Sequence, residues 1–113
     1  MRKEVSVLYE LRIYDTVVGK PPELNERFDK ITLGYFDKHG ITVIGFWTDE
    51  IGTSNRLTYM LAFEDEGQRA KAWAAFRADP ERQKLFAATE RAGPLVAKIT
   101  NTLMRPTSYS PLK

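Results

Sequence analysis

The chain has 113 residues, of which 42% are apolar and 28% are charged, and its formal net charge is +2. This is the size of one domain and the composition of an ordinary soluble globular protein, and so small a net charge does not call for a nucleic-acid partner. The chain has no cysteine, which excludes disulfides, thiolate metal sites and thiol catalysis. We therefore predict a single domain over residues 1–113, with a C-terminal tail from about residue 106.

The N-terminal residues lead directly into a strand-like run, without an apolar signal core or a small-residue cleavage site. No apolar run approaches the ~20 residues that are needed to span a bilayer. We expect a cytoplasmic protein with no membrane partner.

The first strand is predicted at residues 5–14, where side chains alternate between two faces. One face is almost purely apolar and carries Val5, Val7, Tyr9, Leu11 and Ile13. The other face is mixed and carries Ser6, Leu8, Glu10, Arg12 and Tyr14. We expect the apolar face to pack on helices and the mixed face to meet the sheet of a second copy.

The first helix is predicted to begin at Pro21 and Pro22, because a proline in the first turn loses no intrahelical hydrogen bond. Its apolar stripe consists of Leu24, Phe28, Ile31 and Tyr35. Gly40 provides the left-handed position at which such helices end.

A β-hairpin is predicted next, with strands at residues 41–50 and 55–63 around a Gly-Thr-Ser-Asn turn. The first of these strands is apolar on both sides, which favours a strand covered on both faces. Gly45 allows a close approach or a bulge. In the second strand, one apolar face carries Leu57, Tyr59, Leu61 and Phe63.

The second helix is predicted to begin at Asp65, with Gln68 as its capping partner and with Trp73 and Phe76 on its buried face. The run Asp79-Pro80-Glu81 then predicts a break and a new helix start, and this segment ends near residues 92–94. The last strand, at residues 96–104, is the most polar and is predicted at a sheet edge.

The order strand, helix, strand, strand, helix, strand predicts an α+β, ferredoxin-like βαββαβ fold with a four-stranded antiparallel sheet and helices on one face. We expect the other face of the sheet to be too apolar for water, with Leu8, Tyr14, Met60 and Met104 upon it. This predicts a homodimer.

Several short motifs resemble the NIPSNAP family over nearly the whole chain. They are Tyr9-Glu10-Leu11-Arg12-Ile13-Tyr14, Gly19-Lys20, Lys38-His39-Gly40, Gly45-Phe46-Trp47-Thr48 with Glu50 and Gly52, Asn55, Phe63-Glu64 with Arg69, and Asp79-Pro80-Glu81. The resemblance implies a dimeric α+β barrel, a superfamily with many unrelated chemistries. Family members often carry His and then Trp where this chain has Tyr59 and Leu61.

His39 is the one histidine and therefore the first candidate for proton transfer near neutral pH. The alternative is a structural role at the end of a helix, where an imidazolium is favoured by the helix dipole. Candidate residues for a small-molecule pocket are Tyr9, Trp47, Tyr59 and Trp73, which could equally belong to the core.

Glu10, Arg12 and Tyr14 are predicted at the dimer interface, where Glu10 and Arg12 would form an ion pair. The functional alternative for Arg12 is bidentate binding of a substrate carboxylate. No residue spacing indicates a metal site, and we expect no cofactor.

Two functions are compatible with this sequence. The first is binding or transformation of a small apolar or aromatic molecule in a pocket between sheet and helices, without a metal. The second is a non-catalytic homodimeric module for protein interaction. A pocket lined by aromatic side chains would favour the first, and a filled interior the second.

Overall fold

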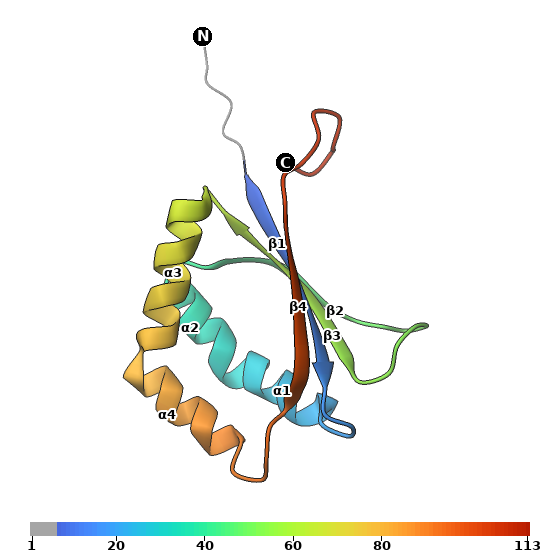
Figure 1. Ribbon diagram of the computed structural model, residues 1–113, viewed down its shortest axis with the longest axis vertical. Coiled ribbons are helices and arrows are strands. Elements are labelled where there is room, and N and C mark those ends of the chain that lie inside the picture. The colour runs from blue at the N-terminus through green and yellow to red at the C-terminus, as the bar shows by residue number, and fades with distance from the viewer. Residues whose placement is uncertain (1–6) are drawn as a thin grey trace.

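The computed structural model describes residues 7–113, so positions 5 and 6 of the predicted first strand lie outside the described residues. Helices cover one face of a four-stranded sheet (Figure 1). Along the chain the elements are β1 (Leu8–Thr16), α1 (Pro21–Arg27), the π-helical turn η1 (Phe28–Thr32), α2 (Leu33–Lys38), β2 (Thr42–Thr48), β3 (Arg56–Phe63), α3 (Glu66–Ala78), α4 (Pro80–Thr89) and β4 (Val96–Met104). The predicted α+β, ferredoxin-like fold is confirmed.

The strand order is β2-β3-β1-β4, and all neighbours are antiparallel. The edge position predicted for β4 is therefore confirmed. The prediction that β2 is covered on both faces is wrong, because β2 is the other edge and much of it is exposed. Its apolar pattern is broken by a bulge at Ile44, where the pairing with β3 shifts between Val43 and Gly45.

The two faces of β1 are the reverse of what the sequence predicted. Arg12 lies opposite Tyr59 of β3, and Glu10 lies opposite Leu61, so these side chains share the face that the helices cover. Tyr9 pairs with Ala62 on the outer face. The placement of Glu10, Arg12, Tyr14 and Leu8 on the outer face of the sheet is wrong, whereas Met60 and Met104 do lie on the outer face. Contact of Glu10, Arg12 and Tyr14 with a second copy stays a prediction.

The first helical region is continuous from α1 through η1 to α2, and the wider π-helical turn rotates the residues that follow it. Leu24, Phe28 and Tyr35 are buried as predicted, and Ile31 packs at the margin of the core. Phe36 is also buried, at 1% exposure, although the predicted stripe omitted it. A stripe drawn at 3.6 residues per turn cannot anticipate a π-helical turn.

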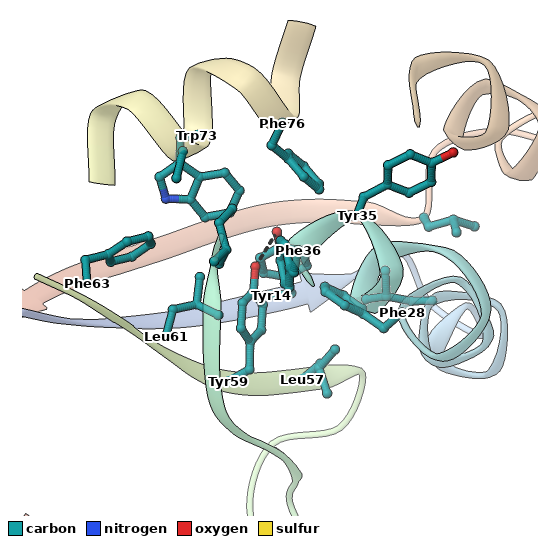
Figure 2. Packing of buried hydrophobic residues seen from close by; sticks show 14 residues of the cluster. Tyr14, Phe28, Tyr35, Phe36, Leu57, Tyr59, Leu61, Phe63, Trp73 and Phe76 are labelled. Carbon is teal, nitrogen blue, oxygen red and sulfur yellow. Dashed lines mark hydrogen bonds between the residues drawn. The ribbon is translucent and has the colours of Figure 1, made fainter. Parts of the chain in front are cut away.

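The core between sheet and helices is a cluster of rings (Figure 2). Phe36 lies 5.7 Å from Trp73 and 5.2 Å from Phe76, measured between ring centroids. Phe28 lies 5.2 Å from Tyr59 in an edge-on arrangement. Trp73 and Phe76 are buried as predicted. These rings fill the centre of the layer between the sheet and the helices.

Two carboxylates start the last two helices as the sequence indicated. Asp65 Oδ1 accepts a hydrogen bond of 2.8 Å from the amide of Gln68 and caps α3. Asp79 Oδ1 accepts from the amides of Glu81 and Arg82 at 3.1 and 3.2 Å and caps α4. The predicted break at Asp79 is thus confirmed, although α4 ends at Thr89, earlier than expected.

Candidate functional site

A polar cluster lies between the sheet and the helices, and we call it the Glu10 cluster. Its members come from β1, β3, α3 and β4, and they are Glu10, Arg12, Tyr14, Tyr59, Arg69, Trp73 and Asn101.

The carboxylate of Glu10 is at the centre of the cluster and is fully buried. Arg69 of α3 donates two hydrogen bonds of 2.9 Å, from Nε to Oε1 and from Nη2 to Oε2. Trp73 Nε1 donates to Oε1 at 2.9 Å, and Asn101 Nδ2 on β4 donates to Oε2 at 3.0 Å. Arg12 Nη1 donates to Oε2 at 2.9 Å. A buried carboxylate is tolerated only when it is paired and hydrogen-bonded in this way.

The Arg12 guanidinium joins this carboxylate to two tyrosines. Its Nε donates to the Tyr59 hydroxyl at 2.7 Å and its Nη2 to the Tyr14 hydroxyl at 3.3 Å. The Tyr59 hydroxyl donates to that of Tyr14 at 2.9 Å, the contact dashed in Figure 2. The guanidinium also lies 4.6 Å from the Trp73 ring centroid, a cation–π distance. The Arg12 side chain is 13% exposed, so the cluster reaches solvent at this point.

The environment fixes the charges of these groups at neutral pH. Burial acts to raise the pKa of Glu10, but the hydrogen bonds from Arg69, Asn101 and Trp73 outweigh it and lower that pKa from 4.5 to about 2. Burial, together with the neighbouring Tyr14, raises the pKa of Tyr59 well above its ordinary value. Glu10 is therefore ionised and Tyr59 neutral, an arrangement suited to binding rather than to proton transfer by Glu10.

The side of β4 that faces the helices is left uncovered. Leu103 and Ile99 pair with Glu10 and Tyr14 of β1, so they lie on the helix-covered face of the sheet. Even so, Ile99 is 47% and Leu103 is 38% exposed. Two apolar side chains thus border the Glu10 cluster at an open edge of the layer.

His39 lies at the end of α2 and has Asp79 as its polar partner. The distance from His39 Nε2 to Asp79 Oδ2 is 2.8 Å, and Lys38 Nζ donates to the same oxygen at 2.8 Å. Hydrogen bonds from Lys38 and His39 hold the pKa of Asp79 well below its usual range. His39 thereby ties the end of α2 to the start of α4. Its role in proton transfer stays a prediction.

The four residues predicted to line a pocket do not share one. Tyr59 and Trp73 both belong to the Glu10 cluster, and both contact Arg12. Tyr59 accepts a hydrogen bond from Arg12, and the Trp73 ring lies against the Arg12 guanidinium. Tyr9 lies on the outer face of the sheet, where it pairs with Met104 and is buried. Trp47 is on the same outer face and is 51% exposed. Ligand contact with any of the four stays a prediction.

Sequence reasoning did not identify Arg69 and Asn101 as members of a site. Arg69 was noted for its resemblance to a family motif, and Asn101 as part of a polar strand. The available signal was on β1, where charged residues at positions 10 and 12 stand between Leu8 and Tyr14 on a single face. Charged side chains on an otherwise apolar strand face need polar partners from neighbouring elements. Here Arg69 on a helix and Asn101 on an edge strand are those partners.

Among residues 7–113, no group of three or more His, Asp or Glu side chains is arranged to hold a metal ion. In the same part of the chain, no helix is long and apolar enough to cross a membrane.

The element order and the antiparallel sheet define the class of protein, an α+β chain with the ferredoxin-like βαββαβ fold. The sequence pattern of the NIPSNAP family matches residues 9–111. The chain therefore belongs to the NIPSNAP family. No curated protein matches it.

Solved structures of NIPSNAP proteins have the same fold. An uncharacterized NIPSNAP-like domain protein from Burkholderia xenovorans is 26% identical, with a TM-score of 0.84 over 96% of this chain and 91% of that one. A NIPSNAP family protein with unknown function from Agrobacterium tumefaciens is 27% identical, with a TM-score of 0.84 over 98% and 97% of the two chains. SnoaB, a cofactor-independent oxygenase from Streptomyces nogalater, is 20% identical, with a TM-score of 0.60 over 96% of this chain and 99% of that one. At that identity the likeness to SnoaB is one of fold alone.

Proposed function

We propose that this NIPSNAP protein binds a small apolar or aromatic molecule, without a metal, at the edge of the sheet–helix layer next to β4. The observation that carries the proposal is the Arg12 side chain, which is hydrogen-bonded to Glu10 and to two tyrosines and yet is 13% exposed. Fixed polar groups beside apolar walls are the usual make-up of a small-molecule site.

The packing of the interior favours a binding site at the β4 edge of the layer between sheet and helices, rather than at the centre of that layer. The rings of Phe28, Phe36, Tyr59 and Phe76 occupy the centre and are all buried. At the β4 edge, by contrast, Ile99 and Leu103 are exposed on the helix-covered side of the sheet. A ligand there would cover apolar surface now in water, and covering such surface contributes about 25 cal/mol per Å².

A titration with the neutral probe 2-naphthylmethanol tests this proposal. In two-dimensional ¹H–¹⁵N NMR, we expect the largest shifts at the Trp73 indole N–H and at the amides of β4. Leu103→Lys, which places a charge at the proposed site, should abolish those shifts. Thr102→Lys is the matched control, because Thr102 neighbours Leu103 but pairs with Leu11 on the outer face. Equal binding by both variants, or shifts confined to another surface, would contradict the proposal.

The second candidate is a homodimeric module, and the outer face of the sheet favours it. Leu11, Ile13 and Met60 are half-buried there, and Trp47 is 51% exposed. A sheet face of this character is well suited to packing against a second sheet. Sedimentation equilibrium at micromolar concentration tests it: a dimer is expected, and a clean monomer of 13.0 kDa would exclude it.

A further inference from the structure

The Glu10 cluster contains more hydrogen-bond donors than it has acceptors for them. Arg12 and the hydroxyls of Tyr14 and Tyr59 are joined by three hydrogen bonds, which use two guanidinium protons and one hydroxyl proton. Whichever tyrosine donates to the other, the second hydroxyl proton has no acceptor within this group.

Arg12 itself has donors left over. A guanidinium carries five N–H groups. Among the described residues, one of these donates to Glu10, one to Tyr14 and one to Tyr59. One N–H group on each Nη atom of Arg12 and one tyrosine hydroxyl proton thus have no acceptor among the described residues, and the Arg12 side chain is 13% exposed.

The charges of the cluster are unbalanced in the same direction. Arg12 and Arg69 are both cationic, and Glu10 is the carboxylate between them. Glu66 is a further acidic neighbour of Arg69, but it is exposed, and water screens its field. Arg12, Arg69 and Glu10 together therefore carry one positive charge more than they carry negative charges.

From these observations we propose that the ligand is a small carboxylate with an apolar or aromatic body. Its carboxylate accepts hydrogen bonds from Arg12 and a tyrosine hydroxyl, and its body covers Ile99 and Leu103. Charge-assisted hydrogen bonds from an arginine are the strong ones, and a planar carboxylate fits the two N–H groups of a guanidinium. This inference rests on the proposed binding site and adds the chemical class of the ligand.

Two probes of matched shape, 2-naphthoate and the neutral 2-naphthylmethanol, test the inference by calorimetric titration of the full chain at pH 7. We expect naphthoate to bind at least about tenfold more tightly, a difference of about 1.4 kcal/mol. Arg12→Gln should remove this preference, so that the two probes bind this variant with affinities within about threefold of each other. Glu10 keeps its Arg69, Trp73 and Asn101 partners in that variant.

Two further variants keep the test decisive if Arg12→Gln does not fold. Ile99→Glu adds a negative charge at an exposed position of β4 on the helix-covered face of the sheet, and it should also remove the preference for naphthoate. Arg56→Gln is the matched control and should retain it, because Arg56 is paired with Asp15, outside the cluster. Equal affinity of the wild-type chain for both probes would overturn the carboxylate inference alone. Binding of neither probe at the β4 edge would overturn the proposed function as well.

Discussion

Replacing Glu10 by Gln removes the charge on which the Glu10 cluster is built and changes little else in shape. Oε2 of Glu10 accepts from Arg12, Arg69 and Asn101. An amide of glutamine has one acceptor oxygen and one NH₂ group, so donors would face donors at one of the two positions. The two arginines would also lose the carboxylate that lies between them.

The expected loss of stability can be worked out in two independent ways. Removing one partner of a buried ion pair costs about 3–5 kcal/mol. The fall in the pKa of Glu10 from 4.5 to about 2 corresponds to about 3 kcal/mol, at about 1.4 kcal/mol for each pH unit. We therefore expect Glu10→Gln to lower the free energy of unfolding by about 3 kcal/mol at pH 7.

The direction of the pH dependence follows from the sign of this change. Because the pKa of Glu10 is lower in the folded chain, its stabilising contribution is fully present above pH 4.5 and is lost as the pH falls toward 2. The Glu10→Gln variant lacks this titrating carboxylate, so its stability does not contain this pH-dependent contribution. The difference in unfolding free energy between the wild type and Glu10→Gln should thus narrow by about 1 kcal/mol between pH 7 and pH 3.5.

Urea unfolding followed by circular dichroism at both pH values measures this difference, with Glu50→Gln as a control at an exposed turn position. The control should stay within about 0.5 kcal/mol of the wild type. A loss below about 1 kcal/mol for Glu10→Gln at pH 7, or a difference that does not change with pH, would refute the reasoning about a buried, paired carboxylate.

Three further predictions concern the core, the helix junction and the outer face. Phe36→Ala should destabilise the chain by about 3–5 kcal/mol in urea unfolding, against less than about 1 kcal/mol for Leu33→Ala, since Phe36 is buried and Leu33 is 37% exposed. Asp79→Asn should lower the melting temperature less than Asp79→Ala does, because Asn can still cap α4. Equal losses would show that Asp79 stabilises the chain mainly through Lys38 and His39 and not through the cap. Met60→Lys should shift the sedimentation equilibrium toward the monomer if the outer face joins two copies.

Much of the fold was determined by the sequence, because the relevant signals are local. Alternation predicted β3 and its buried face, and Asp79 and Pro80 predicted where α3 ends and α4 begins. Gly45 indicated a close approach or a bulge in β2, and the pairing of β2 with β3 does shift between Val43 and Gly45. The polar character of β4 predicted an edge strand. Each of these depends on a few neighbouring residues, whose backbone preferences act before tertiary contacts form.

Only the tertiary structure decided which face of β1 the helices cover, and with it the nature of the candidate site. Alternation shows that Glu10, Arg12 and Tyr14 share a face, but it does not show on which side α3 lies. The more apolar face was the reasonable choice for the interior, and it was wrong because Arg69, Trp73 and Asn101 come from distant elements and satisfy the buried carboxylate. Burial of a charge depends on its partners, and partners separated by 59 to 91 residues in the chain come together only when the sheet and helices assemble.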